Sequence, residues 1–576
     1  MNSWLMRHWG ENRWLMMDAL AITVGLAGGL IAVLFRMLVD VVHLLFFEIL
    51  LPILPGCGSA MILFPVLGGL LAGLIVFRIA PEIRGDGLPE LIESLHKRGG
   101  QMKKRTGLAL LFASTITIGS GGSAGRDSPI SQMGAYLGSL LGQKFKLTTG
   151  DVQILVICGL VAGLAGTFNA PLGCAIFGME VVLKRFKMVD AVPILLSAVV
   201  GAAVATSFLG QNPAFLVPEM DLTLAELWLC FILGVAFGVL SSLWVGLLYG
   251  AERFFDELPL KNELKAGLGG VVTGLAGFYL IGYGVMGVGY EGIIRILDMA
   301  VNSAEQGYVQ IVIFLLILAV AKALATASTL GSGACGGYIS PTMYVGAVMG
   351  AAAGLIFGAI FPVAQNHVSI YAFLGAGALF AGSAGAPLTC IVLIPEMAAD
   401  YSLLPPMMLS CAASYGLAQV ILKRSTIYTL KLEKKGISLE ESEAVLDGVL
   451  VEKAMKHEVI SVNSETPISQ VRALIRVHNI RGFPVLKEGR LIGIITFDDV
   501  RKVPEDKQDD VKVCDVAIKK VITAYPDESM KQVMDRLYDN NVGRLIVVDR
   551  EDPERLLGIV TKSDAIKAYE LSAENV

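Results

Sequence analysis

Long apolar runs fill the chain up to about Lys423, and charged residues become dense only beyond it. A helix needs about 20 apolar residues to cross a bilayer. Runs of that order cover residues 18–48, 59–80, 191–210, 224–250, 263–284, 307–330 and 402–422, whereas those at 107–118, 129–141 and 368–381 are too short. Short segments at membrane depth are tolerated where they line a protein-walled cavity. The pattern therefore predicts a polytopic α-helical membrane domain that contains broken helices.

The apolar region repeats itself. Residues 169–180 read NAPLGCAIFGME and residues 385–396 read GAPLTCIVLIPE, so each Ala-Pro-Leu triplet is followed by a glutamate, Glu180 or Glu396. Each copy lies downstream of a Gly-rich break, GSGGSAGRDSP or GSGACGGYISP. Matching broken segments predict that the domain arose by duplication and consists of two repeated halves. The substrate site is expected where the two halves meet.

The charged tail repeats as well. Residues 450–502 and 513–570 each read as strand, helix, strand, strand and helix, which is typical of a small α/β unit. The two copies share G-I-I/V-T-x-x-D, at Gly493–Asp499 and Gly558–Asp564. The predicted organisation is a membrane domain at 1–430, a linker at 431–449, and α/β domains at 450–506 and 507–576.

Composition excludes several classes of function. Only 17% of the 576 residues are charged and the mean hydropathy is +0.65, whereas soluble proteins carry about 25% charged residues. The net charge of −5 gives no indication of nucleic-acid binding. The eight cysteines form no CxxC pair, so neither a metal site nor a disulfide framework is expected. No HExxH, G-x-S-x-G or P-loop motif indicates an enzyme.

Positive charge predicts the orientation of the membrane domain. Basic clusters flank the apolar runs at 97–105, 184–187 and 423–435, and such clusters favour the cytoplasmic side. The connection at 211–222 carries Glu219 and Asp221 but no Lys or Arg, so it is expected outside. Because the last cluster joins the tail directly, the tail is predicted to be cytoplasmic.

Three glycine-containing turns carry the candidate ion chemistry. They read Gly85-Asp86-Gly87-Leu88-Pro89, Gly125-Arg126-Asp127-Ser128-Pro129 and Gly337-Tyr338-Ile339-Ser340-Pro341. Each ends in proline, which is favoured in the first turn of a helix. Free N–H groups and the helix dipole make such N-termini anion sites that need no fixed counter-charge. Three such turns within an apolar chain indicate an anion pathway.

These turns resemble the motifs G-S-G-I-P, G-R-E-G-P and G-x-F-x-P of the CLC family of chloride channels and transporters, in the same order. The stretch LAGTFNAPLGCAIFGME and the segment STIYTLKL, with a pore tyrosine at Tyr428, are also similar to that family. The tail resembles a pair of CBS domains. The resemblance implies a homodimer in a lipid bilayer, namely a bacterial inner membrane, in which each subunit conducts chloride or another small anion.

Departures from the motifs affect the implied site. The family's gating glutamate corresponds to Asp127, which either gates the pore or only favours the helix dipole. The family's anion-coordinating serine corresponds to Asp86, whose carboxylate would repel an anion unless it is protonated or caps a helix away from the pore. The motif phenylalanine is Ile339, and Tyr428 either donates to the anion or anchors at the membrane interface.

The remaining anion-binding candidates are neighbours of these residues in the motifs. They are Gly87, Arg126 and Tyr338, and Arg126 is also expected to order its loop and to raise the local positive potential.

The proton path separates two functions. Exchangers of the family usually carry a glutamate where this chain has Val181, directly after Glu180. Glu180 is either part of a proton path or a hydrogen-bonded support. The apolar Val181 favours channel-like, gated anion conduction, weakly coupled to protons at most; the alternative is a coupled anion/proton antiporter, for chloride or another anion.

The tail leaves two interpretations open as well. By resemblance, Thr496, Asp499, Thr561 and Asp564 could bind ATP, ADP or AMP, with Arg481 and Arg544 neutralising phosphate. The other interpretation is that each Thr caps a helix and each Asp stabilises its first turn. No cofactor is required for the expected transport.

Overall fold

The structure is a computed structural model that describes residues 13–54, 58–210, 224–301, 308–364, 367–434, 449–478, 480, 482–519, 521–540 and 542–564. The chain divides into two compact units, Met1–Lys435 and Gly436–Val576. Glu219, Asp221 and Arg481 lie outside the described residues.

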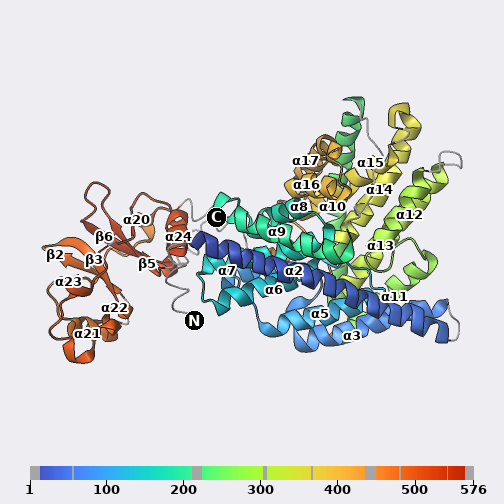
Figure 1. Cartoon of the computed structure of the whole chain (residues 1–576). Coiled ribbons are helices and arrows are strands. Elements are labelled where there is room, and N and C mark those ends of the chain that lie inside the picture. Colours follow the sequence, from blue (N-terminus) through green and yellow to red (C-terminus); the bar gives the residue numbers. More distant parts are fainter. Residues whose placement is uncertain are drawn as a thin grey trace. The chain divides into compact units, whose positions relative to one another are not determined.

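The first unit is built from helices, which confirms the predicted polytopic α-helical class (Figure 1). Within its described residues, eight helical segments are long and apolar enough to cross a membrane. Their main helices are α2 (Arg13–His43), α3 (Leu63–Ile79), α7 (Thr149–Phe168), α9 (Met188–Leu209), α10 (Leu224–Glu257), α13 (Tyr308–Gly331), α14 (Ile339–Ile360) and α17 (Leu404–Ile421).

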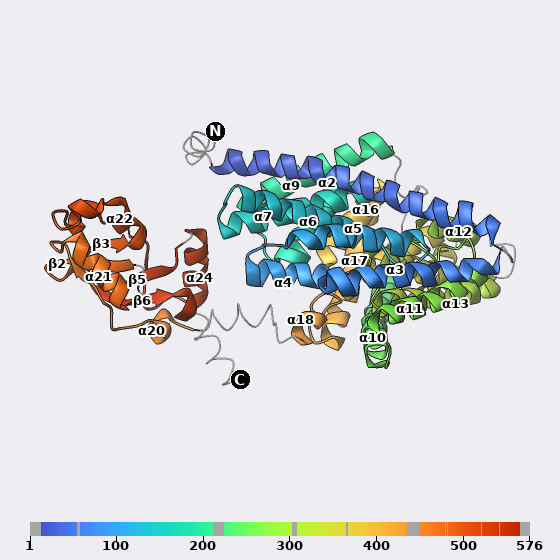
Figure 2. The ribbon, with the colours of Figure 1, turned by 90° about the horizontal axis from the view of Figure 1, so that it is seen from below.

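The unit contains further helices, most of them short. They are α4 (Leu88–Arg98), α5 (Lys104–Gly119), α6 (Asp127–Lys144), α8 (Pro171–Phe177), α11 (Asn262–Tyr279), α12 (Tyr290–Val301), α15 (Val368–Ala384), α16 (Pro387–Ala398) and α18 (Leu430–Lys434). The long helix α2 runs beside α7 and α9 in both views (Figures 1 and 2). Several of these helices begin within the apolar unit, among them α4, α6 and α14, so their polar N-terminal amides lie inside it.

Matching glycine contacts occur in the two halves of this unit. A β-carbon on Gly134 of α6 would lie 2.0 Å from the carbonyl oxygen of Gly159 in α7. In the second half, a β-carbon on Gly346 of α14 would lie 2.5 Å from the carbonyl oxygen of Gly375 in α15. Glycine lets membrane helices approach this closely. The equivalent packing of α6 on α7 and of α14 on α15 is what a duplicated sequence should give.

The second unit contains two three-stranded sheets of the same topology. Their orders are β1-β2-β3 and β4-β5-β6, with the first pair parallel and the second antiparallel in each. The strands are β1 (Val462–Asn463), β2 (Gly482–Lys487), β3 (Arg490–Thr496), β4 (Thr523–Ala524), β5 (Arg544–Val548) and β6 (Leu556–Thr561). The helices are α20 (Val451–Ala454), α21 (Ile468–His478), α22 (Phe497–Lys502), α23 (Val513–Val516) and α24 (Met530–Asp539). The predicted pair of α/β repeats is confirmed.

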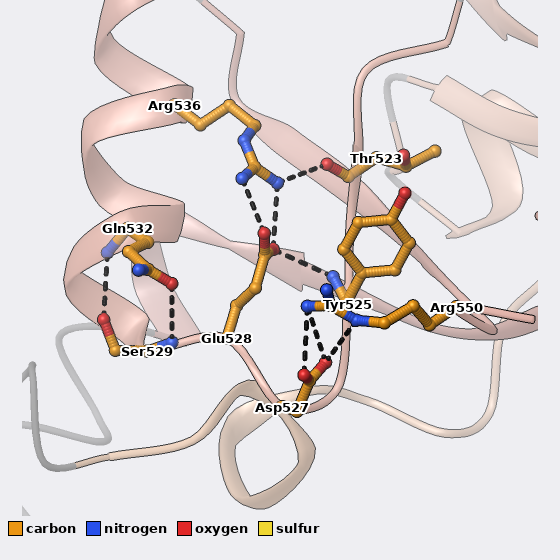
Figure 3. A network of polar contacts seen from close by, with 8 residues as sticks. All are labelled: Thr523, Tyr525, Asp527, Glu528, Ser529, Gln532, Arg536 and Arg550. Carbon is orange, nitrogen blue, oxygen red and sulfur yellow. Dashed lines mark hydrogen bonds and ion pairs between the residues drawn. The ribbon is translucent and has the colours of Figure 1, made fainter.

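Charged contacts tie the second repeat together (Figure 3). Glu528, just before α24, pairs with Arg536 at 2.7 Å and also accepts the amide of Tyr525 at 2.9 Å. Arg550 pairs with Asp527 and lies 4.6 Å from the centre of the Tyr525 ring. These bonds fix the chain between β4 and α24 against the end of β5.

Candidate functional site

The three glycine-containing turns meet in one place. Gly85 forms a bridge with Cys335, and Gly125 and Gly337 exchange backbone hydrogen bonds at 2.8 and 2.7 Å. The segment before α14 therefore lies between the turn before α4 and the turn before α6. This pairing brings the N-termini of α4, α6 and α14 together, as anion binding by helix ends requires.

Asp127 is the first residue of α6 and is fully buried. Its Oδ1 accepts the amide of Ser340 at 3.3 Å and the hydroxyl of Ser340, so it reaches the first turn of α14. Its Oδ2 has no hydrogen-bond partner among the described residues. A β-carbon on Gly337 would lie 2.4 Å from that oxygen, so the carboxylate fits only because residue 337 is glycine. The carboxylate thus occupies an amide and a hydroxyl that could hold an anion.

Asp86 is nearly buried and bonds to all three helix beginnings. Its Oδ1 accepts the amide of Leu88 at 3.1 Å, which caps α4. Its Oδ2 accepts the Ser128 hydroxyl at 2.9 Å and the Tyr338 amide at 2.8 Å. The bond to Leu88 is the one that the helix-capping interpretation describes, and the same carboxylate also binds the beginnings of α6 and α14.

The other expected pore residues lie in different surroundings. Tyr428 is buried, and its hydroxyl has no hydrogen-bond partner among the described residues. Its ring contacts Phe177 at the end of α8, edge to face at 6.4 Å. Ile339 is buried at the start of α14, and Gly87 adopts φ +72° before α4. Arg126 lies over the Tyr290 ring at 5.8 Å, so the structure places its charge on an aromatic face.

Glu180 and Glu396 make reciprocal contacts between the repeated halves. Glu180 accepts the amides of Leu388 and Thr389 at 3.0 and 2.8 Å, at the start of α16. Glu396 accepts the amides of Leu172 and Gly173 at 3.0 and 2.7 Å, at the start of α8. Carboxylates are favoured at helix N-termini because the unpaired N–H groups point at them.

This bonding is what the support interpretation of Glu180 expects. Val181 is buried beside it, in a π-helical turn that covers Gly178–Leu183.

A cavity of about 380 Å³ lies beside the first of the three turns. Gly87 and Gln132 form part of its wall, and the Gln132 side-chain amide donates to the Asp86 carbonyl at 2.5 Å. Charged residues of both signs line the rest of it: Glu82, Arg84, Glu90, Glu93, Arg98, Lys103, Glu252 and Lys431. Lys431 pairs with Glu90 across 2.7 Å. A cavity with charged walls therefore reaches the backbone next to Asp86.

Several residues at the site were not singled out in the sequence. Ser128 and Ser340 stand inside the motifs and bind the two carboxylates, while the Tyr290 hydroxyl lies 2.9 Å from that of Ser340. Lys322 of α13 is fully buried and donates to the carbonyls of residues 284, 285 and 287. A lysine within an apolar run was the available signal, because intramembrane ionisable residues usually have a role.

The candidate nucleotide residues are bonded to each other. Thr496 and Asp499 form a capping box at the start of α22, with the Thr496 hydroxyl 2.6 Å from the carboxylate. Thr561 and Asp564 repeat the contact at 2.6 Å. Burial acts to raise the pKa of Asp499, but hydrogen bonds from Thr496 and Lys502 outweigh it and leave this pKa below its usual value.

Arg544 lies at the beginning of β5, and burial lowers its pKa. It donates to the Gly482 carbonyl at 3.0 Å, so it joins the two repeats. The helix-capping interpretation accounts for the bonds of both Thr–Asp pairs in this structure.

Comparison with known proteins is consistent with this geometry. Residues 68–419 match the family described as "Voltage gated chloride channel", and residues 451–506 and 513–571 each match "CBS domain". The chain is 32% identical over 361 residues to a putative chloride channel protein ClcB-like of Ralstonia nicotianae, covering 62% of this chain and 82% of the relative. It is 30% identical over 412 residues to the H(+)/Cl(-) exchange transporter ClcA of Yersinia pseudotuberculosis, covering 69% and 84%.

A solved structure is similar as well. It is described as a slow cyanobacterial Cl-/H+ antiporter and is 27% identical, with a TM-score of 0.64 over 73% of this chain and 97% of that one.

Proposed function

This chain belongs to the CLC family of chloride channels and transporters, and on that premise we propose that it is a chloride/proton antiporter in which Asp127 gates the anion pathway. Chloride transport is the property of the family. The coupling to protons is proposed because the relatives described as exchangers cover most of this chain. The apolar Val181 favoured a channel in the sequence analysis, whereas these relatives favour the alternative given there, a coupled anion/proton antiporter.

The observation that carries the proposal is the position of the Asp127 carboxylate. As an anion, it occupies the Ser340 amide at the start of α14, and one of its oxygens is buried without a partner among the described residues. A proton on that oxygen removes the charge and weakens its hold on the helix ends. A chloride ion can then take the place of the carboxylate. Exchange of the two anions on one set of amides links proton binding to chloride binding.

Each candidate has a role in this proposal. The amides of Ile339 and Ser340 and the hydroxyl of Tyr428 would hold the anion, with Gly87 leaving room for it and Arg126 setting the local potential. The amide of Tyr338 would join them only where Asp86 releases it. Glu180 would support the start of α16 rather than carry protons, because both of its oxygens are occupied. The apolar Val181 carries no proton.

The membrane placement is also part of the proposal. The cavity is lined by Arg98 and Lys103, which belong to a basic cluster, so we place it on the cytoplasmic side of a bacterial inner membrane. The second unit would then be cytoplasmic, since it follows another basic cluster at 423–435. The working protein is taken as a homodimer with one pathway in each subunit.

Purified protein in chloride-loaded liposomes tests the antiport. With potassium and an ionophore to carry the charge, an outward chloride gradient should drive protons inward, so that the external medium becomes alkaline. A protonophore should abolish the pH change and leave chloride efflux. Chloride efflux with a constant external pH would instead establish the passive channel.

Regulation by adenine nucleotide is proposed for the second unit. A nucleotide would have to replace the Thr–Asp bonds at 496–499 and 561–564, since these groups satisfy each other. Calorimetry of the whole protein with ATP, ADP and AMP should give saturable heat that Asp564→Ala and Asp499→Ala weaken. Absence of heat with all three nucleotides would leave capping as the role of these residues.

A further inference from the structure

Asp86 holds the same kind of groups that a transported anion needs. Its carboxylate takes one amide from the start of α4, one from the start of α14 and a hydroxyl from α6. A side-chain carboxylate that accepts hydrogen bonds from backbone amides uses the same donors that a free anion would use. A free anion cannot use the amides of Leu88 and Tyr338 while Asp86 is ionised and in place.

Two polar groups nearby are left without partners. The Oδ2 of Asp127 and the hydroxyl of Tyr428 are both buried and unbonded among the described residues. Asp86 binds Ser128 and the Tyr338 amide, and Asp127, which precedes Ser128, binds Ser340, so the two carboxylates share one site. A β-carbon on Gly337 would lie 2.4 Å from Asp127 Oδ2 and 3.0 Å from Ser128 Oγ, the donor to Asp86. Buried polar groups usually find a partner, so the unpaired ones point to a missing ligand.

The two carboxylates differ in their position relative to the 380 Å³ cavity. Both are buried, but Asp86 directly precedes Gly87 and its carbonyl accepts Gln132, and both of these residues line the cavity. A proton from the cavity therefore meets Asp86 before Asp127.

We propose that Asp86 is a second, proton-dependent gate of the anion pathway, on the cavity side of Asp127. When ionised, it occupies the amides of Leu88 and Tyr338 and keeps the anion out. When a proton from water in the cavity binds it, the neutral acid releases these amides and the anion binds; the proton returns to water when the anion leaves. The inference rests on the proposed function, because it assumes that this site conducts an anion.

Other ionisable groups also face this position. Asp127 of α6 acts on Asp86 through its charge, and the charge of Asp86 acts in turn on three tyrosines and a cysteine. These are Tyr249 of α10, Tyr338, Tyr428 and Cys335. None of these four ionises near neutral pH at its ordinary value. Glu90 and Glu252 face the cavity from its wall, and Asp127 is the other carboxylate within the three turns. The Asp127 variant separates its contribution from that of Asp86.

Chloride efflux from liposomes tests the inference, with equal pH on both sides over about pH 5 to 8, where shifted carboxylates titrate. Wild-type efflux should fall as the pH rises, because the protonated fraction of one carboxylate falls by up to about tenfold per pH unit. Asp86→Asn and Asp86→Ser should flatten this fall and raise efflux at the alkaline end by about tenfold. In the Asp127→Ala background, adding Asp86→Asn should remove the pH dependence that remains.

A milder pair of variants keeps the carboxylate. Ser128→Ala removes a hydroxyl that stabilises the ionised Asp86, so the efflux profile should move toward alkaline pH by about one unit. Ser131→Ala is the matched control: Ser131 is buried in the same helix but bonds to the Ser128 carbonyl, and its loss should move nothing.

The outcomes separate this inference from the antiport. An unchanged pH profile in the Asp86 variants and in Ser128→Ala, with normal gel-filtration behaviour, would overturn the second gate even if protons are coupled to chloride. A wild type that moves chloride without protons would overturn the antiport, and the flattening caused by Asp86→Asn would still establish the gate.

Discussion

Asp127→Ala is expected to abolish proton movement coupled to chloride while chloride efflux continues. The variant removes the only described carboxylate that binds the Ser340 amide, and alanine can neither carry a proton nor compete with an anion for that amide. An outward chloride gradient that alkalinises the medium around wild-type liposomes should leave the external pH constant for the variant. The expected loss of coupling is complete, because no proton-binding group remains at position 127 and Asp86 returns its proton to the cavity from which it came.

Two further substitutions separate charge from size. Asp127→Asn keeps the shape and removes the proton site, so it should behave like Asp127→Ala. Asp127→Glu restores an acid with one more methylene, and it should keep some coupling if the space beside Gly125 and Gly337 admits it. Proton movement that persists in both Asp127→Ala and Asp127→Asn would show that the gate lies elsewhere.

The sequence predicts the repeated architecture well because its signals are local. The Gly-rich turns and the two Ala-Pro-Leu segments mark helix ends whatever surrounds them, and the G-I-I/V-T-x-x-D segments mark strand ends. The predicted spans do not include α7 or α14. Both are rich in small residues and largely enclosed by protein, with 89% and 61% of their most apolar windows buried. Packing, rather than contact with lipid, determines the composition of such helices.

The contacts of the site could not be predicted from the same signals. The position of Asp86 depends on the bridge between Gly85 and Cys335. These two residues are about 250 positions apart in the sequence, so no local pattern indicates their contact. The reciprocal caps of Glu180 and Glu396 likewise join separate halves. The spacing of these glutamates reveals the repeat, but their partners follow only from how the halves meet.

Lys322 is the last residue whose role only the structure reveals. Its ammonium group donates to the carbonyls of Gly284, Val285 and Gly287 at 2.9, 3.2 and 2.9 Å, and it lies 5.2 Å from the centre of the Tyr344 ring. No ion pair of Lys322 occurs within the described part of the chain. Three carbonyls thus replace the water of a buried cation, and the lysine in turn closes the loop that leads to α12.

Lys322→Met is therefore expected to destabilise the membrane unit by on the order of 3 kcal/mol. Three buried carbonyls lose their donor, at a cost of about 1 to 3 kcal/mol each. Part of this cost is offset because the variant no longer buries a charge. Thermal unfolding in detergent, followed by gel filtration, measures this. Lys265→Met is the matched control, because buried Lys265 donates to a single carbonyl, that of Asp256, and should cost only about 1 kcal/mol.

The same variant should also slow transport. The loop held by Lys322 ends at Tyr290, whose hydroxyl lies 2.9 Å from that of Ser340, the donor to Asp127. A loosened loop moves this donor, so chloride efflux should fall in Lys322→Met, measured at a temperature where the variant remains folded, and stay near wild type in Lys265→Met. Equal stability and equal efflux in the two variants would show that the three carbonyls find other donors. In that case the buried charge of Lys322, rather than its hydrogen bonds, would have to explain its position beside the pathway.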